Sequence, residues 1–376
     1  MSTATRKEHL STKATAVSFR AKASDLLPAL LPLNGVAPVR SPRPILGHLR
    51  IAVGKKGLEA SATDLEMWVT AKAEVLESSG EGIFAVPSDA FLQILREVGD
   101  QEVRVGFRED GMAAVEADRD RFEIACLSAD EFPACGEKPE GAKCTVPAGV
   151  LGRLLKRTAF AVARERTRYT LNGVHWSLDG DRLEVVATDG RRLALARAAV
   201  KGQGKAKGIL PVRAVSQILQ LGEGPFTVAM GERALEVRTP GHTLVSRLLE
   251  GQFPDYTAVI PKDYPAAATA PAQELLSAFR RAALLSMESR AVRLVFRKGG
   301  LTLSGGDPGR GQTKIEADVQ YQGANVDLRI NPDFVMDGLK TWGDSPVRWE
   351  LRDSVSPCVL KEGDDHLYVV LPITLE

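Results

Sequence analysis

The sequence has 376 residues, of which 44% are hydrophobic and 26% are charged. This length allows two or three domains with substantial cores, because a domain takes about 150 residues. The 49 basic and 48 acidic side chains give a net charge of +1, which excludes a uniformly basic nucleic-acid coat but not a local basic face. No apolar run approaches the roughly 18 residues of a membrane span, and the amino-terminus lacks a signal-peptide core.

Residues 1–16 are small, polar and cationic, and we expect them to form a flexible tail. The four cysteines show neither CxxC pairing nor the spacing of metal ligands. Reduced cytosolic thiols are therefore the simplest interpretation.

One pattern recurs six times along the chain: an extended apolar stretch, a Pro or polar break, and a segment with helical spacing. The predicted helical segments are 20–32, 87–98, 147–166, 211–221, 271–290 and 331–341. The first carries Pro28 and Pro32 in its interior, which predicts a short or kinked helix. The other five open on prolines 60 to 64 residues apart, and proline suits a first helical turn, where its missing N–H would have no partner. These prolines are Pro87, Pro147, Pro211, Pro271 and Pro332.

Alternating apolar and polar runs, broken by Gly or Asp, follow each predicted helix and are typical of antiparallel strands. Two such units would make a domain, so we expect three similar domains of the α+β class, with helices gathered on one face of antiparallel sheets. The predicted boundaries lie in stretches rich in Pro, Gly and charge. They divide the chain into a tail at 1–16 and domains at 17–137, 138–262 and 263–376.

Patterns for catalysis or metal binding are weak. Residues 306–313 have the glycine spacing of a phosphate-binding loop but lack its Lys and lie between two predicted strands, which favours a hairpin turn. The five histidines occupy separate segments without zinc-site or catalytic spacing. Asp64, Asp189 and Asp353 lie at strand–turn positions where Asx turns are the commoner role, with Mg²⁺-binding carboxylates as the alternative. The sequence therefore argues against an enzyme, and no cofactor is expected.

Formal charge is distributed unevenly between helices and strands. The six helical segments together carry +5 although the whole chain carries +1, so the remainder is acidic. A weakly basic helical surface suits contact with phosphate groups independent of base sequence. Aromatic residues make up only 6% of the chain and do not interleave with the basic residues, so base stacking is not indicated.

Local strings along the chain resemble the bacterial sliding clamp family, the beta subunit of DNA polymerase III. They extend from about Val17 to the end of the chain, and the combination of LNG, ATDGxRLA and FPDY at these spacings is highly specific. The strings are PILGHL at Pro44, ATDLEM at Ala62, TRYTLNGV at Thr167, VATDGRRLAL at Val186, GQFPDYTAVIP at Gly251, AFRRAALLS at Ala278 and LYVVLPITL at Leu367.

The resemblance implies a head-to-tail homodimeric ring, with helices lining the hole and sheets forming the outer wall. Double-stranded DNA would pass through the hole, and retention would be topological and independent of sequence. DNA polymerase and the subunits of an ATP-driven clamp loader would bind through short peptide motifs, and the tethered polymerase would rebind its primer end at high effective concentration. A cytoplasmic, nucleoid-associated location without membrane contact would follow.

The family's partner-peptide site lies between the second and third domains, and its positions can be matched here. Its deep apolar part would be built from Leu171, Thr188, Gly190, Arg191, Arg192, Leu193, Pro254, Val259, Val369 and Leu371. A neighbouring groove would use Arg168, Thr170, Phe334, Val355 and Pro357. Three positions depart from the common pattern: Thr170 replaces an aromatic residue, Arg191 a His and Ala258 an Arg. These departures leave the partner motif open.

The resemblance also assigns a dimer interface and DNA contacts. Phe122 and Ile124 of one subunit would meet Leu284 and Leu285 of the other, and the first two alternate along a strand so that they share a face. The implied DNA contacts are Arg40, Arg168, Tyr169, Arg213 and Lys262. The charge of the third helix adds Arg153, Lys156 and Arg157.

Three alternatives to a processivity clamp stay open at the level of sequence. A paralogous clamp for repair polymerases, or one tolerating a clamp-directed inhibitor, would keep the fold and change the partners. A DNA-processing enzyme would use scattered carboxylates with Mg²⁺. A monomeric sequence-specific DNA binder would show base-dependent affinity on short duplexes.

Overall fold

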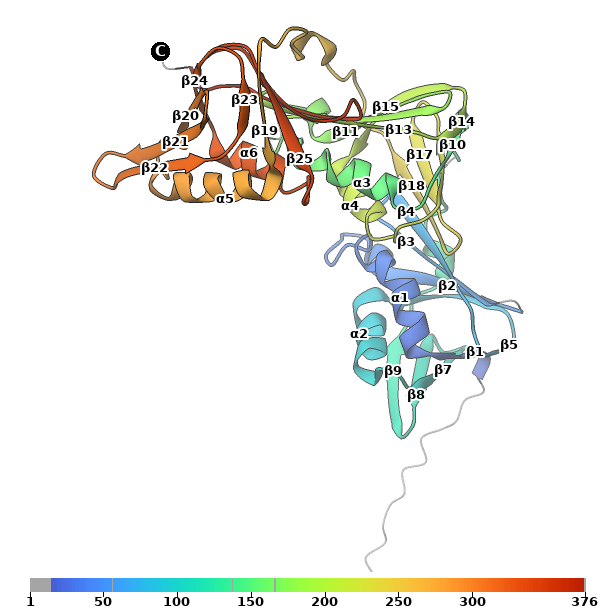
Figure 1. The fold of residues 1–376 in the computed structure, drawn as a ribbon. Coiled ribbons are helices and arrows are strands. Elements are labelled where there is room, and N and C mark those ends of the chain that lie inside the picture. Colours follow the sequence, from blue (N-terminus) through green and yellow to red (C-terminus); the bar gives the residue numbers. More distant parts are fainter. Residues whose placement is uncertain (1–14, 56, 137, 166, 375–376) are drawn as a thin grey trace, which may run out of the picture. The chain divides into compact units, whose positions relative to one another are not determined.

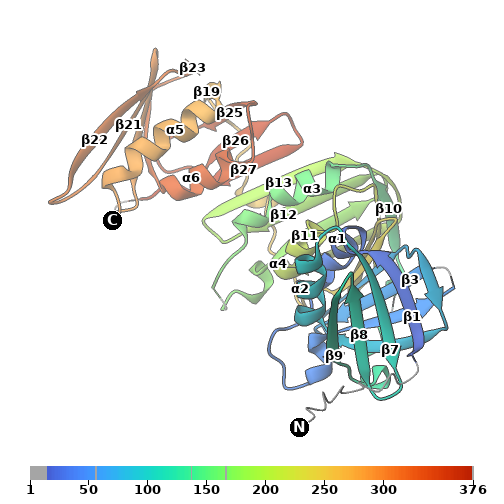
Figure 2. The same ribbon diagram turned by 90° about the horizontal axis from the view of Figure 1, so that it is seen from below.

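The computed structural model describes residues 15–374 except residues 56, 137 and 166, so the predicted tail at 1–16 lies almost wholly outside the described residues. The chain forms two compact units (Figures 1 and 2). The first comprises the described residues up to Lys138 together with Glu236–Ser246, and the second comprises Pro139–Leu235 and the chain from Arg247 onward. None of the helices in this described part is long and apolar enough to cross a membrane.

The first unit contains antiparallel sheets and two helices. One sheet has the order β5 (Glu77–Ser79), β1 (Thr15–Lys22), β7 (Glu102–Arg108), β8 (Met112–Ala117) and β9 (Asp120–Ala125), which leaves β9 at an edge. The other has the order β4 (Met67–Ala73), β3 (Gly57–Thr63), β2 (His48–Gly54) and β6 (Gly82–Pro87), and residues 242–246 of β18 (His242–Arg247) pair with β4. Helix α1 (Ala23–Asn34) packs against α2 (Ser88–Val98) and β4.

A nine-stranded antiparallel sheet forms the core of the second unit. Its order is β15 (Lys205–Pro211), β11 (Gly173–Asp179), β12 (Arg182–Thr188), β13 (Arg192–Ala199), β27 (His366–Val370), β26 (Cys358–Glu362), β25 (Pro346–Leu351), β19 (Ala266–Pro271) and β23 (Gln320–Gln322). The sheet joins distant parts of the sequence because β13 pairs with β27, with Leu193 opposite Val369. The second and third predicted domains therefore share one sheet.

The second unit also contains a four-stranded sheet and the strands that pair with β10. One has the order β22 (Gly311–Ala317), β21 (Gly300–Asp307), β20 (Val292–Arg297) and β24 (Val326–Ile330), which leaves β22 at an edge. Strand β10 (Ala142–Val146) pairs with β14 (Lys201–Gln203) and with β16 (Phe226–Met230). Strand β17 (Ala234–Arg238) spans the division between the two units.

Four helices pack on these sheets, each through its own apolar face. Helix α5 (Ala272–Ala282) buries Leu275, Leu276 and Phe279, the spacing expected of an amphipathic helix, and packs against α6 (Pro332–Leu339) and β22 (Figure 1). Helix α3 (Val150–Lys156) packs against β13, and α4 (Val212–Ile218) packs against β15 and β11. The predicted α+β class with antiparallel sheets is confirmed.

Several local predictions were wrong. Helix α1 is 12 residues long despite Pro28 and Pro32, so of the two predicted alternatives the short helix is wrong and the kinked helix stays a prediction. The segment predicted at 147–166 is helical only as the seven residues of α3, followed by a 3-10 turn at Ala159–Ala161. Of the five prolines, only Pro332 lies within the first helical turn. Pro87, Pro211 and Pro271 precede their helices with extended backbone, because each also ends the preceding strand, and Pro147 lies in the turn before α3.

The prediction of Asx turns is confirmed at all three aspartates. The Asp64 carboxylate accepts hydrogen bonds from the backbone N–H groups of Glu66 and Met67 (3.1 and 2.8 Å). The Asp189 carboxylate accepts from the backbone N–H groups of Arg191 and Arg192. The Asp353 carboxylate accepts from those of Val355 and Ser356 (2.9 and 2.6 Å). The carboxylates therefore close turns between strands.

Candidate partner-binding site

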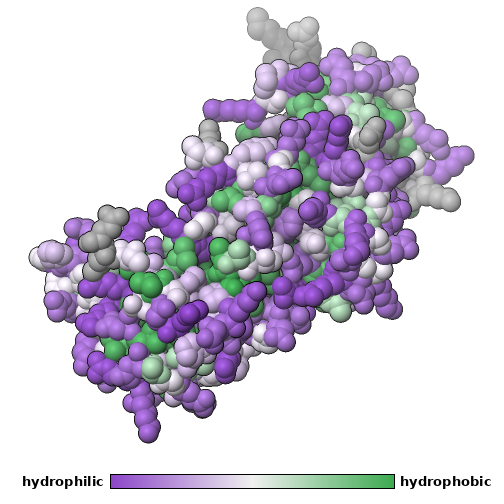
Figure 3. Space-filling model, turned by 90° about the horizontal axis from the view of Figure 1, so that it is seen from above, coloured by the Kyte–Doolittle hydropathy of each residue, from purple (hydrophilic) through white to green (hydrophobic). Residues whose placement is uncertain are grey.

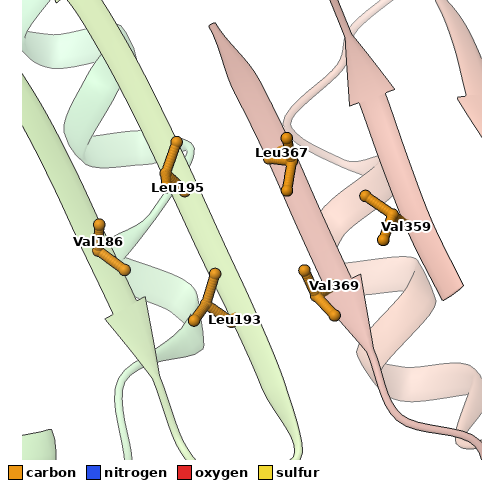
Figure 4. Packing of buried hydrophobic residues seen from close by; sticks show 6 residues of the cluster. All are labelled: Val186, Leu193, Leu195, Val359, Leu367 and Val369. Carbon is orange, nitrogen blue, oxygen red and sulfur yellow. The ribbon is translucent and has the colours of Figure 1, made fainter. Parts of the chain in front are cut away.

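Buried aliphatic side chains form the floor of the predicted partner site, at the junction of β13 and β27. Leu193 and Val369 face each other across the junction and are 3% and 2% exposed (Figure 4). They pack in one cluster with Val186, Leu195, Val359 and Leu367. Leu193 and Val369 are therefore part of the core, and a bound peptide could reach them only through the side chains that cover them.

The segment after β18 covers this floor with aromatic and aliphatic side chains. Phe253, Tyr256, Ile260 and Tyr264 pack against the cluster. The ring of Phe253 also stacks on His175, with the ring centroids 5.0 Å apart, and the Tyr256 hydroxyl donates to Glu184. From this segment, sequence reasoning assigned only Pro254 and Val259 to the partner site, although the FPDY string contains both Phe253 and Tyr256.

The apolar surface available to a partner comes from other residues of the predicted set. Leu371, Val259 and Val355 are 39%, 48% and 61% exposed. Pro254 is also exposed, whereas Thr170, Leu171 and Pro357 are partly buried. In Figure 3 hydrophobic residues appear as small patches within a mostly hydrophilic surface. Single exposed apolar residues are ordinary, so only the grouping of these positions around one floor marks a site.

A tight turn between β12 and β13 positions the arginines of the site. The Thr188 hydroxyl donates to the Arg192 carbonyl (2.6 Å) and accepts from the Gly190 N–H (3.1 Å). Gly190 has φ of 87°, and a Cβ there would collide with Nη1 of Arg168. Arg168 uses that nitrogen to donate to the Asp189 carbonyl (2.9 Å). The backbone conformation thus favours glycine, and a Cβ at this position would push aside the end of the flexible Arg168 side chain.

Arg192 lies at the centre of a buried hydrogen-bond network, with a side chain that is 6% exposed. Its guanidinium donates to the carboxylates of Asp189 (3.0 Å) and Asp337 (2.9 Å) and to the Phe160 carbonyl (3.0 Å). It also lies 4.6 Å from the ring centroid of Phe334. Burial alone would raise the pKa of Asp337, but the hydrogen bonds from Arg192 and Lys340 outweigh it and lower that pKa. Arg192 is therefore a structural residue that fixes α6 against β13.

A cavity of about 440 Å³ opens beside this network. Of the predicted site residues, Arg168, Arg191, Arg192 and Phe334 line it. Arg168 and Arg191 are exposed, and Arg192 and Phe334 provide its inner wall. The structure thus brings together the charged part of the predicted groove beside the aliphatic floor.

The predicted DNA contacts are all at the surface or partly exposed. Arg153, Lys156 and Arg157 line a second cavity of about 270 Å³, and Arg157 is paired with Glu362. Tyr169 is exposed, as are Arg168, Arg213 and Lys262 in the same unit. Arg40 is exposed in the first unit. Their contacts with DNA stay predictions.

The predicted interface residues occupy sheet edges and an exposed turn. Phe122 and Ile124 lie on the edge strand β9, where Phe122 is partly exposed and Ile124 is buried. Leu284 and Leu285 lie in a 3-10 turn, Ala283–Leu285, that directly follows α5. Leu284 is 67% exposed, so its side chain is available to a partner.

The second unit also contains a fully buried histidine. His366 is fully buried and stacks on Trp342, with the ring centroids 4.1 Å apart. Neither of its ring nitrogens has a hydrogen-bond partner among the described residues. Burial, assisted by the nearby charge of Arg157, lowers the pKa of His366 to about 3. The ring is therefore neutral in the folded protein at ordinary pH.

Other candidate chemistry resolves into structural roles. Residues 306–313 form the end of the β21–β22 hairpin, with the predicted turn at residues 308–310, and the Asp307 carboxylate accepts from the N–H groups of Glu288 and Ser289 (2.7 and 3.0 Å). Within residues 15–374, apart from the three gaps, no group of three or more His, Cys, Asp or Glu side chains is placed to hold a metal ion.

Comparison with known proteins identifies this fold. Residues 17–136, 145–255 and 257–374 match the N-terminal, central and C-terminal domains of the DNA polymerase III beta subunit. The beta sliding clamps of Pseudomonas aeruginosa and Escherichia coli K12 are each 31% identical, over 95% and 96% of this chain and all of theirs. A crystal structure of the P. aeruginosa sliding clamp bound to griselimycin superposes with a TM-score of 0.91 at 29% identity, covering 96% of this chain and 100% of that one.

The class is thus a protein of three similar clamp domains, each built from antiparallel sheets and helices. The chain belongs to the DNA polymerase III beta-subunit family, the beta sliding clamps. The predicted family and fold class are confirmed. The domain boundaries at 137/138 and 262/263 and the assigned site residues stay predictions.

Proposed function

We propose that this chain is the processivity factor of DNA replication in its cell, a sliding clamp without enzymatic activity. The observation that carries the proposal is the match of all three domains to the DNA polymerase III beta subunit over nearly the full chain. Two copies would close head to tail around double-stranded DNA, in the cytoplasm. The similarities give no specific support to a specialised paralogous clamp.

The edge strands β9 and β22 support the proposed homodimer. An open sheet edge has unpaired backbone N–H and C=O groups that promote aggregation, and pairing the edge with another subunit satisfies them. Phe122 and Ile124 on β9 and the exposed Leu284 beside β22 would form the apolar part of this interface.

The exposed basic residues on the helices support passage of DNA without tight binding. Arg153 and Lys156 lie on α3 and Arg213 lies on α4. A few such contacts attract the phosphate backbone, whereas many would add steep salt dependence and slow sliding. Polymerase and clamp-loader subunits would bind by short peptides over the floor formed by Leu193 and Val369.

Retention of labelled protein on circular DNA tests this function. The protein is loaded on a nicked circular plasmid with a clamp loader, washed in moderate salt, and the plasmid is then cut once. We expect loss on linearisation, because a topological ring slides off free ends. Equal retention on circular and linear DNA would contradict the proposal and favour a DNA binder that holds its site by contacts.

A further inference from the structure

The cavity beside the Arg192 network extends beyond the predicted partner site. Arg168, Arg191, Arg192 and Phe334 are common to the cavity and the site. The remaining lining residues are assigned no role by the family resemblance: Val162, Ala163, Arg164, Glu165, Asp189, Arg290, Asn331, Asp333 and Asp337. We call the part lined by Arg164, Arg168, Arg191 and Arg290 the arginine groove.

The arginine groove carries an excess of unneutralised positive charge. Asp189 and Asp337 in its wall are neutralised by two cations, because both accept from the buried Arg192 and Asp337 also pairs with Lys340. The four groove arginines are exposed, and among the described residues that line the cavity Glu165 and Asp333 remain as opposing charges. The guanidinium of Arg168 is bound to a carbonyl oxygen rather than to a carboxylate, so its charge is also uncompensated.

Arg290 is held at the groove by a fixed loop. The Asp307 carboxylate accepts hydrogen bonds from the N–H groups of Glu288 and Ser289 (2.7 and 3.0 Å). Arg290 itself has φ of 46° and donates its N–H to the Ser286 carbonyl (3.1 Å). A left-handed backbone is uncommon for a residue with a long side chain, and it persists here because the surrounding loop determines it.

We propose that the arginine groove receives a carboxylate-bearing segment of the same partner peptide whose apolar residues dock on Leu371 and Val259, an inference that rests on the proposed function. Guanidinium groups pair with carboxylates through two parallel hydrogen bonds. The groove is continuous with the partner site, because the Leu371 N–H donates to the Arg191 carbonyl (3.0 Å). This clamp would therefore select partners with acidic residues beside the apolar anchor.

The lining favours a peptide over a nucleic-acid strand as the occupant. Glu165 and Asp333 lie among the arginines and would repel a continuous run of phosphates. Val162, Ala163 and Phe334 give the groove an apolar floor that suits peptide side chains. A single peptide carboxylate can bind an arginine at a distance from Glu165 and Asp333. A continuous run of phosphates would have to pass close to these two carboxylates.

Fluorescence anisotropy with three labelled peptides tests the proposal on the full-length protein. Each peptide carries Gln and Leu-Phe residues, which the family resemblance implies for the usual partner peptides. All three peptides have two further residues before the motif and two after it. In one peptide the two residues before the motif are Glu, in the second the two residues after it are Glu, and in the third all four are Gln. We expect one acidic peptide to bind about 2- to 10-fold more tightly than the neutral one, as for two exposed ion pairs, and the advantage to fall as salt rises from about 0.05 M to about 0.5 M.

Substitutions then locate the effect. Arg164→Gln and Arg290→Gln should abolish the acidic preference and leave the affinity for the neutral peptide unchanged. Arg297→Gln, which removes an exposed arginine outside the cavity, is the matched control and should retain the preference.

The remaining outcomes separate the two proposals. Equal affinity for all three peptides would overturn the arginine groove and leave the clamp function standing. Failure of every peptide to bind, together with failure on circular DNA, would overturn both. Binding of a single-stranded oligonucleotide that Arg164→Gln and Arg290→Gln weaken, with peptide preference unchanged, would make the groove a nucleic-acid track and overturn the peptide assignment.

Discussion

The guanidinium of Arg192 and the carboxylate of Asp337 form a hydrogen-bonded ion pair at 2.9 Å between residues that are 145 positions apart. Arg192 begins β13, and Asp337 lies on α6. The pair therefore fastens the helix of the C-terminal domain to the sheet of the central domain, directly beneath the partner site. Its integrity affects both stability and the shape of the groove.

Removing one partner of this pair should destabilise the protein. We expect Arg192→Met to lower the free energy of unfolding by about 3 kcal/mol or more, because Asp189 and Asp337 would lose their buried counter-ion. Asp337→Asn should cost about 1–2 kcal/mol, since Arg192 keeps its other acceptors. Urea denaturation of both variants and the double variant measures the coupling, with the exposed Asp364→Asn as control. Additive effects would show that the two side chains do not interact.

Gly190→Ala should weaken peptide binding more than it lowers stability. The added Cβ would displace the Arg168 guanidinium, and the positive φ would add strain of about 1 kcal/mol. Gly180→Ala is the matched control, because Gly180 has φ of 59° and open space around its Cβ position. The control should show the strain alone, with peptide affinity retained. Equal peptide affinity of the two variants would mean that Arg168 does not contribute to binding.

Substitution by Ala should affect peptide binding at Leu371 and protein stability at Leu193. Leu371→Ala should weaken binding of a partner peptide at little cost in stability, because the side chain is 39% exposed. Leu193→Ala should cost about 2–5 kcal/mol of unfolding free energy, because it opens a cavity in the sheet core. Thermal denaturation and peptide titration of each single variant distinguish the two roles. Unchanged peptide affinity in Leu371→Ala would remove this residue from the site.

Leu284→Asp combined with Leu285→Asp should yield soluble monomers. Two charges would be buried at the proposed joint without partners, which costs far more than a dimer contact gains. Light scattering coupled to size-exclusion chromatography measures the mass. Val39→Asp, at an apolar residue that is 93% exposed in the first unit, is the control and should remain dimeric. A double variant that stays dimeric would refute the interface.

Acidification should destabilise the protein through His366. A histidine whose pKa is lowered from 6.5 to about 3 is neutral when folded and takes up a proton on unfolding. Stability is therefore retained above pH 6.5 and falls below it, by about 1.4 kcal/mol per pH unit from this residue. The buried His175, whose pKa burial also lowers, acts in the same direction.

The variant His366→Leu should show a shallower loss of stability between pH 6.5 and about pH 5 than the wild type. Because this change could disturb the packing on Trp342, NMR titration of the wild-type ring provides a second measurement. A His366 resonance that titrates near pH 6.5 would contradict the prediction.

Local patterns predicted the fold because each depends on neighbouring residues. The turns at Asp64, Asp189 and Asp353 and the hairpin at 306–313 follow from side chains that bond to backbone within three residues. Helix ends were predicted less well, since Pro87 serves both as the end of a strand and as the residue before a helix.

The network of the candidate site could not be predicted in the same way. Arg192 was assigned to a partner surface, but its acceptor Asp337 lies on a distant helix and nothing local indicates the pairing. The burial of Leu193 likewise depends on Phe253 and Tyr256, which are far along the chain. The family resemblance supplied the positions of the partner-site residues. Only the three-dimensional packing shows which of them are buried in the floor and which are exposed to a partner.

The pairing of β13 with β27 has a consequence for synthesis of the protein. Strand β13 ends at Ala199, and its neighbour β27 begins only at His366, so ~170 residues must follow before the sheet can close. At about 5–20 residues per second, the ribosome needs roughly 10–30 seconds for that interval. During this interval the nascent chain displays an unpaired apolar edge on β13 that includes Leu193 and Leu195, the kind of surface that chaperones protect.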